Sequence, residues 1–146
     1  MNNWKIITYE TLQFYRSPNQ DSPQIGAEDL RNSLKLCRKS NSKCKISFIG
    51  ITCGLSAPYV AGQLVEALEH PEEYSSVGLI GHNPISLARN DPIENWDHGT
   101  FRSISQDLEK SNRSIIITPV FGGETISGSS RMKGGSGSSF ISGLLF

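Results

Sequence analysis

An excess of charge of either sign is the first thing that this sequence lacks. Across 146 residues, 14 lysine and arginine residues balance 14 aspartate and glutamate residues, and both signs are scattered along the chain. Because such a chain has no net field that attracts polyanions, neither nucleic acid nor an anionic membrane is expected as a partner. The length fits one compact domain and leaves no room for two.

Long apolar runs and paired cysteines are also absent. No stretch approaches the roughly 18–20 apolar residues of a spanning helix, and the N-terminus lacks a basic region followed by an apolar stretch. Cys37, Cys44 and Cys53 form no C-x-x-C pair and have no histidine at ligand spacing. We therefore expect a soluble intracellular protein in a reducing compartment, without a disulfide framework or a zinc site.

The few histidines indicate neither a metal site nor a catalytic cluster. His70, His82 and His98 stand far apart in the sequence, each beside turn-forming or charged residues. Ordinary surface positions are expected for all three. No metal or other cofactor is predicted.

Short apolar runs alternate with segments of helical periodicity. Three runs rich in β-branched residues predict buried parallel strands, at Ile46–Ile51, Val77–Ile80 and Ile115–Val120. Apolar residues at helical spacing predict helices over Gly26–Lys39, Ser56–Glu69 and Phe101–Lys110. This alternation predicts an α/β fold, with a parallel sheet flanked by helices on both faces.

The remaining segments give weaker signals. Trp4–Tyr9 is a poorer strand candidate, while the prolines of Arg16–Pro23 and Asn90–Thr100 predict loops. Trp96 and Phe101 are expected to pack the second loop onto the domain. No internal repeat is present, which excludes a solenoid.

The loop after the first strong strand has the composition of an anion site. Gly50–Pro58 follows a buried strand and opens a helix. Glycines allow close backbone approach to a phosphate, helix-start amides point outward, and Thr52 and Ser56 add hydroxyl donors. The alternative interpretation is a well-capped helix, with Ser56 as N-cap and Pro58 in the first turn.

Two further features join this loop as candidates. Ser127–Gly135 combines hydroxyls, glycines and two cations, and Arg131 has the guanidinium that grips phosphate oxygens well, although the same composition suits a flexible loop. Both loops should lie beyond the carboxyl ends of strands, where open α/β sheets bind ligands. Glu28 and Asp29 either complement the dipole at the start of the first helix or, for Glu28, accept a sugar hydroxyl.

Three segments together resemble a known family. Ile49–Gln63, Gly81–Trp96 and Ser127–Gly135 are similar, in this order, to the SIS (sugar isomerase) domains of the glucokinase regulatory protein family, over about residues 24–136. The related N-acetylmuramic acid 6-phosphate etherases share the Ser-Arg-Met-Lys segment. However, they usually carry Gly-Arg-Thr-Pro in place of Gly54–Pro58 and lack an equivalent of Ala88–Ile93. The resemblance therefore favours the regulators.

The resemblance implies a flavodoxin-like SIS fold and a fructose phosphate site. The implied ligand-binding residues are Glu28, Thr52, Cys53, Gly54, Ser56, Ser130 and Arg131. Thr52 and Cys53 depart from the family, which more often has Ser and a small apolar residue at these positions. Because threonine keeps the hydroxyl, the implied site stands.

Parts of the family pattern are missing. Nothing before Pro23 matches the Gly-Thr-Ser-Gly-Arg phosphate loop of a complete SIS domain, and the segment after Gly135 lacks an amphipathic pattern. We expect a partial chain, with a poorly assigned segment at 1–23, a partial SIS domain at 24–136 that lacks its N-terminal strand and phosphate loop, and an irregular tail at 137–146.

Three functions remain open at this point. The resemblance implies a non-catalytic regulator of the cytoplasm and nucleus that binds fructose 6-phosphate or fructose 1-phosphate and, in its full-length form, inhibits glucokinase as its partner. The alternative is an etherase-like lyase with Glu28 as acid or base. A structural remnant without a ligand is the third.

Overall fold

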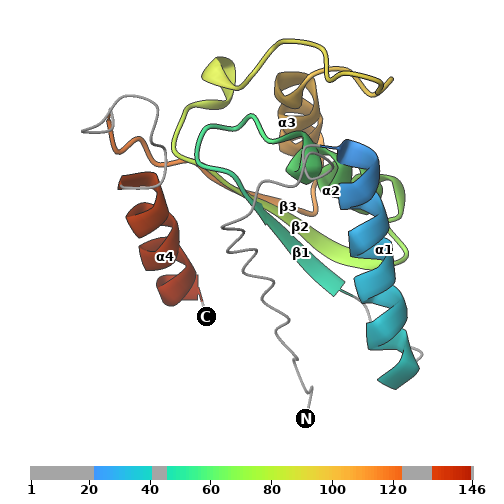
Figure 1. Ribbon diagram of the computed structural model, residues 1–146. Helices are drawn as coiled ribbons and strands as arrows, with labels where there is room; N and C mark the ends of the chain where they lie inside the picture. Colours follow the sequence, from blue (N-terminus) through green and yellow to red (C-terminus); the bar gives the residue numbers. More distant parts are fainter. Residues whose placement is uncertain (1–21, 41–45, 123–132, 146) are drawn as a thin grey trace.

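The computed structural model describes residues 22–40, 46–122 and 133–145. Its regular elements are α1 (Pro23–Ser40), β1 (Ile46–Ile51), α2 (Pro58–Glu69), β2 (Tyr74–Ile80), a 3-10 turn (Ile85–Leu87), α3 (Phe101–Lys110), β3 (Ser114–Ile117) and α4 (Lys133–Leu145). The strands form a parallel sheet in the order β1-β2-β3. The predicted α/β fold, with a parallel sheet flanked by helices, is confirmed (Figure 1).

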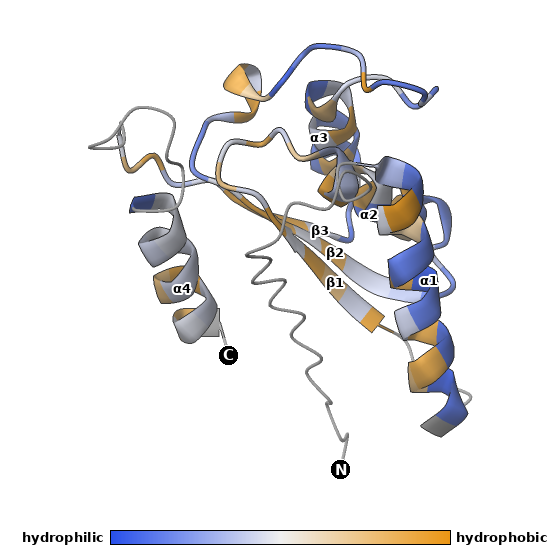
Figure 2. Ribbon diagram, viewed as in Figure 1, coloured by the Kyte–Doolittle hydropathy of each residue, from blue (hydrophilic) through white to orange (hydrophobic). Residues whose placement is uncertain are grey.

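Three helices share one core with one face of the sheet. Leu34 of α1, Leu64 of α2 and Leu108 of α3 are buried in the same cluster as Val77 and Leu79 of β2. Fully burying a side chain of this size stabilises the fold by about 1.5–3 kcal/mol. Figure 2 shows the contrast between the mostly hydrophobic β1 and the mostly hydrophilic connection that precedes α3.

The opposite face of the sheet is less completely covered. In the pleat, Ile51 and Ile115 alternate with the core-facing residues, and they stay 44% and 58% exposed. Cover on this face is partial: Ile80 is only 1% exposed, and α4 lies on the side of the sheet away from α1, α2 and α3 (Figure 1). A strand order of β1-β2-β3 contains no reversal, so crossovers of the same hand place α2 and α3 on the same face.

The observed helix and strand boundaries differ from the predicted ones where polar residues or prolines obscured the hydrophobic pattern. β1 and α3 match their predicted ranges, whereas β2 begins three residues early at Tyr74, which is fully buried. α1 begins at Pro23, because proline fits the first turn of a helix as well as it fits a loop. The predicted strand at Trp4–Tyr9 lies outside the described residues, as does most of the loop at Arg16–Pro23.

The C-terminal segment is helical. The prediction of an irregular tail at 137–146 is wrong for the residues up to Leu145, because α4 spans Lys133–Leu145. Ile141 is only 8% exposed, and a methyl group on Gly137 would overlap the ring of Phe121. Contacts with the rest of the chain therefore favour a helix that the glycine-rich sequence disfavours by itself.

The connection over residues 90–100 is a loop, as predicted. Pro92 pairs with Thr100 in an isolated bridge, and the Gln24 side chain donates to the carbonyl of Asn95 at 2.7 Å. Phe101 is fully buried and Trp96 packs partly buried against the core, which confirms the predicted packing role of both.

A capping box starts α3. The Ser103 amide donates to Thr100 Oγ1 at 3.1 Å, and the Thr100 amide donates to Ser103 Oγ at 3.0 Å. Thr100→Ala should lower the free energy of unfolding by about 1 kcal/mol, whereas Thr100→Ser keeps the acceptor and should lose less than half of that. Urea unfolding of both variants checks this, and equal losses would contradict the capping role.

Candidate functional site

The loops that follow the three strands lie at one edge of the sheet, because the carboxyl ends of parallel strands share that edge. Residues 52–57 follow β1, residues 81–84 follow β2, and residues 118–122 follow β3 (Figure 1). The Thr52 amide donates to the carbonyl of Ile80 at 2.9 Å, and the His82 amide donates to the carbonyl of Cys53 at 2.9 Å. These bonds tie the first two loops together.

Leu55 anchors the first of these loops. Its side chain is fully buried although its φ of 51° lies in the left-handed region. A side chain on Gly81 would overlap Leu55 Cδ2, so glycine at 81 leaves room for the leucine. The Leu55 carbonyl also accepts from the Arg89 amide at 3.1 Å. The loop is therefore fixed by the packing of the Leu55 side chain and by the backbone hydrogen bond from Arg89.

The start of α2 differs from the prediction. Its N-cap is Ala57, with φ −77° and ψ 115°, and Pro58 occupies the first turn. Ser56 is therefore not the N-cap, because proline at 58 fixes the helix start one residue later. No side chain caps this helix end. An uncapped helix N-terminus favours an anion, and Ser56 is not used in capping it.

His82 is a residue that sequence reasoning missed. It is 8% exposed, so the prediction of a surface position is wrong for this histidine. Its Nε2 lies 2.8 Å from the carbonyl oxygen of Gly134 and 3.0 Å from Ser138 Oγ, and its ring packs edge-on against Phe121 at 4.8 Å. No local signal marked it, since His82 lies in the turn-forming run Gly81–Pro84.

The structure brings together only part of the predicted site. Thr52, Cys53, Gly54 and Ser56 share one loop, in which Thr52 is 8% exposed and the others are partly exposed. Cys53 Sγ lies 3.9 Å from Ser138 Oγ of α4. Ser130 and Arg131 lie outside the described residues.

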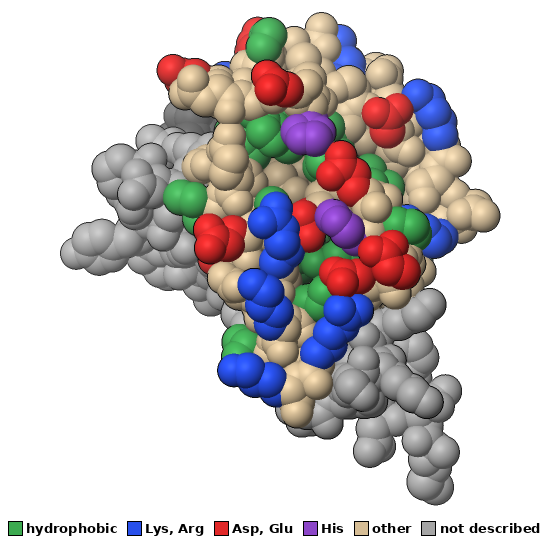
Figure 3. Space-filling view, turned by 90° about the vertical axis from the view of Figure 1, so that its right-hand side faces the viewer, with side chains coloured by type: hydrophobic (Ala, Val, Ile, Leu, Met, Phe, Trp, Pro, Cys, Tyr) green, Lys and Arg blue, Asp and Glu red, His purple; other side chains and the backbone are tan. Residues whose placement is uncertain are grey.

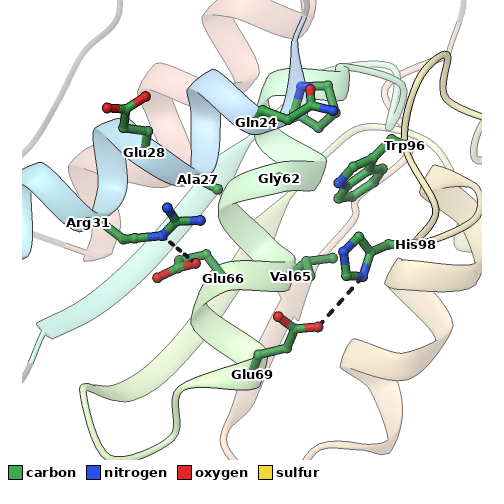
Figure 4. A pocket seen from close by; sticks show the side chains of 11 residues that line it. Gln24, Ala27, Glu28, Arg31, Gly62, Val65, Glu66, Glu69, Trp96 and His98 are labelled. Carbon is green, nitrogen blue, oxygen red and sulfur yellow. Dashed lines mark ion pairs between the residues drawn. The ribbon is translucent and has the colours of Figure 1, made fainter.

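Glu28 lies elsewhere, on α1. It is exposed and lines a groove of about 430 Å³ between α1, α2 and the connection before α3 (Figure 4). The lining comprises Pro23, Gln24, Ala27, Glu28, Arg31, Gly62, Val65, Glu66, Glu69, Trp96 and His98. None of the residues 52–57 belongs to it, so Glu28 and the loop after β1 face different spaces.

The groove contains a buried carboxylate. The Glu66 side chain is 5% exposed, and its Oε2 lies 2.8 Å from Arg31 Nε. This bond is the largest cause that raises the pKa of Arg31. His70 Nδ1 lies 2.9 Å from the backbone carbonyl of Glu66, and this bond is the largest cause that raises the pKa of His70. Burial likewise raises the pKa of Tyr74.

Four charged groups of the groove form two ion pairs, Arg31 with Glu66 and His98 with Glu69. His98 Nδ1 lies 3.6 Å from Glu69 Oε1, and the His98 ring lies 4.9 Å from the ring of Trp96. Figure 3 shows histidine side chains on this face among acidic ones, beside a row of Lys and Arg side chains. Because Glu66 pairs with Arg31 and Glu69 with His98, we interpret the groove as a structural ion-pair network that joins α2 to α1 and to the connection before α3.

Neither a metal-binding cluster nor a membrane-spanning helix occurs in the part of the chain that the structure describes. Within residues 22–40, 46–122 and 133–145, no group of three or more His, Cys, Asp or Glu side chains is arranged to hold a metal ion. In those ranges no helix combines the length and the hydropathy that crossing a bilayer requires.

Comparison with known proteins identifies the class first. Residues 10–68 match the family described as the glucokinase regulatory protein N-terminal SIS domain. The chain therefore contains SIS-domain sequence, and the predicted resemblance is confirmed.

Individual relatives then give the family. The chain is 45% identical over 126 residues to the glucokinase regulatory protein of Xenopus laevis, and 39% identical over 129 residues to those of Mus musculus and Homo sapiens. These matches cover 84–86% of this chain but only 19% of each relative. The chain belongs to the glucokinase regulatory protein family and spans about a fifth of the length of these relatives.

Proposed function

We propose that the chain contributes the loop after β1 to a fructose phosphate site in a non-catalytic regulator of glucokinase. The observation that carries this proposal is the fixed loop at residues 52–57, which leads into a helix N-terminus without a side-chain cap. In the proposed site Thr52, Cys53, Gly54 and Ser56 contact the ligand through backbone amides and hydroxyls. Ser130 and Arg131 add a hydroxyl and a charge-assisted donor to the phosphate.

Electrostatics and chain topology support this location. A helix N-terminus carries about half a positive elementary charge, which favours phosphate. Open α/β sheets bind ligands outside the carboxyl ends of their strands, where this loop lies. Glu28 lines the groove between α1 and α2 instead, so we give it no part in phosphate binding.

The lyase alternative receives no support from the position of Glu28. A general acid or base must reach the reacting group within hydrogen-bond distance or through one water. Glu28 belongs to a groove that includes no residue of the loop at 52–57. Release of lactate from N-acetylmuramic acid 6-phosphate by the purified chain would overturn the non-catalytic proposal.

Titration calorimetry with fructose 6-phosphate and fructose 1-phosphate tests the site. We expect binding with a dissociation constant of about 1 mM, or about −4 kcal/mol, and none with unphosphorylated fructose. Ser56→Ala should weaken binding about fivefold, the equivalent of one net hydrogen bond of about 1 kcal/mol. The matched control Ser86→Ala changes an exposed serine of the 3-10 turn and should leave binding unchanged. Equal binding of fructose and its phosphates would contradict the proposal.

The regulatory role concerns the longer protein. We propose that a full-length protein with this domain forms an inhibitory complex with glucokinase in the cytoplasm and nucleus, and that fructose phosphates tune the complex. Glucokinase activity measured with the full-length protein, with and without fructose 6-phosphate, tests the partner. Imaging of the tagged full-length protein tests the compartment. Unchanged glucokinase activity would contradict the regulatory proposal.

A further inference from the structure

Three segments of the candidate site meet at His82. Its amide donates to the carbonyl of Cys53, its ring contacts Phe121, and its Nε2 reaches the first turns of α4 at Gly134 and Ser138. The residue therefore connects the loop after β1, through its amide, with the segment after β3 and with α4, through its ring. Neither the sequence motifs nor the proposed phosphate contacts assign it a role.

The partner at Nε2 defines the chemistry of the ring. A carbonyl oxygen only accepts hydrogen bonds, so the 2.8 Å contact with Gly134 requires a proton on Nε2 of His82. Ser138 Oγ, at 3.0 Å, lies within reach of the same N–H. Nδ1 is buried and has no hydrogen-bond partner among the described residues. The hydrogen bonding of the His82 ring with α4 therefore depends on a single donor, the Nε2–H group.

Among the side chains of α4 that the structure describes, one large apolar side chain is buried. Ile141 is 8% exposed, whereas Phe140 and Leu144 are 67% and 72% exposed. Four of the 13 residues in α4 are glycines, and each lowers helix stability by about 1 kcal/mol relative to alanine. Gly137 does allow close approach, since a methyl group there would overlap Phe121. A helix with so little buried apolar surface depends on its polar contacts.

We propose that His82 is a positioning residue, whose Nε2–H holds the first turns of α4 against the loop at residues 52–56 and thereby fixes the arrangement of this loop. The expected effect of His82 on sugar phosphate binding rests on the proposed function, whereas the attachment of α4 by His82 is independent of it.

The attachment is measured without ligand through Cys53, whose Sγ lies 3.9 Å from Ser138 Oγ of α4. Alkylation of Cys53 is followed by peptide mass spectrometry, with Cys37 on α1 as the internal reference. His82→Phe keeps a ring against Phe121 but removes the donor, and should raise the alkylation rate of Cys53 about fivefold. His82→Gln keeps an N–H donor near the Nε2 position and should stay within about twofold of the wild type.

The two variants separate positioning from packing. If the ring served only to pack against Phe121, His82→Gln would be the more reactive variant and His82→Phe would resemble the wild type, which would overturn the proposal. Gly137→Ala is a second test, because its methyl group would overlap Phe121 and lie 3.2 Å from His82 Cε1, which pushes α4 away while the imidazole donor itself is kept. It should raise Cys53 alkylation at least as much, and no rise in Gly137→Ala would also overturn it.

Titration with fructose 6-phosphate then tests the link to the site. Its affinity should fall about fivefold in His82→Phe and be restored in His82→Gln. If the wild-type chain binds no sugar phosphate, the proposed function fails, while the alkylation rates still decide the role of His82. If sugar phosphate binds equally to wild type and His82→Phe, the proposed effect of His82 on the site is wrong.

Discussion

Gly62→Ala is expected to lower the free energy of unfolding by about 3 kcal/mol. Gly62 lies inside α2 where α1 crosses it, and a methyl group there would overlap the backbone carbonyl of Pro23. A backbone atom cannot rotate away, so the two helices must separate. Overpacking of this kind costs about 1–3 kcal/mol or more, which exceeds the gain of up to about 1 kcal/mol from replacing a helical glycine.

The effect of Gly62→Ala should show in urea unfolding followed by circular dichroism. Gly143→Ala is the matched control, because Gly143 is also helical but has nothing within 4 Å of the position of its added methyl group. That variant should be neutral or slightly stabilising. An unchanged unfolding midpoint in Gly62→Ala would show that the close crossing of α1 and α2 does not exist.

The same crossing explains the position of the groove. Gly26 of α1 faces the Tyr59 carbonyl of α2, again without space for a methyl group. Glu66, one helical turn after Gly62 on α2, lies 2.8 Å from Arg31 of α1, and Tyr59 Oη donates to Asp29 at 2.8 Å. Helical periodicity identified both helices in the sequence. It contains no information on which glycines face each other.

The first strand was predictable because its residues strongly favour a buried β-strand. Ile46–Ile51 is apolar, rich in isoleucine and bounded by polar segments, so its range was predicted without error. The start of β2 at Tyr74-Ser75-Ser76 was missed because polar residues hide a strand whose first residue is fully buried. Pairing with β1 at Ile46 and Ser47 makes this segment a strand, and such pairing is a long-range contact.

The candidate site was predictable only in part. The loop at 52–56 follows a recognisable strand and precedes a recognisable helix, so its place at the sheet edge followed from topology. The role of His82 depends on α4, which begins 51 residues later in the chain and whose glycines predicted no helix. A residue that acts through a partner so distant in sequence gives no local signal.

Leu55→Ala is expected to destabilise the domain by about 3 kcal/mol and to disturb the proposed site as well. The leucine is fully buried, and removing such a side chain usually costs about 2–5 kcal/mol. Its loss would leave a cavity beneath the loop at residues 52–56, opposite Gly81. Fructose 6-phosphate should bind more weakly, because the amides of the loop would no longer be held in one arrangement.

A glycine variant distinguishes packing from backbone strain at the same position. With φ at 51°, Leu55 occupies a conformation that costs a non-glycine residue about 1–2 kcal/mol. Leu55→Gly removes the strain together with the side chain, so it should be at least as stable as Leu55→Ala, which reverses the usual order of these two residues. Leu87→Ala, at a leucine that is 67% exposed, is the control and should stay within about 0.5 kcal/mol of the wild type. Urea unfolding of the wild type and the three variants measures the free energies of unfolding. A Leu55→Gly variant that is clearly less stable than Leu55→Ala would mean that the loop does not adopt a left-handed conformation at Leu55.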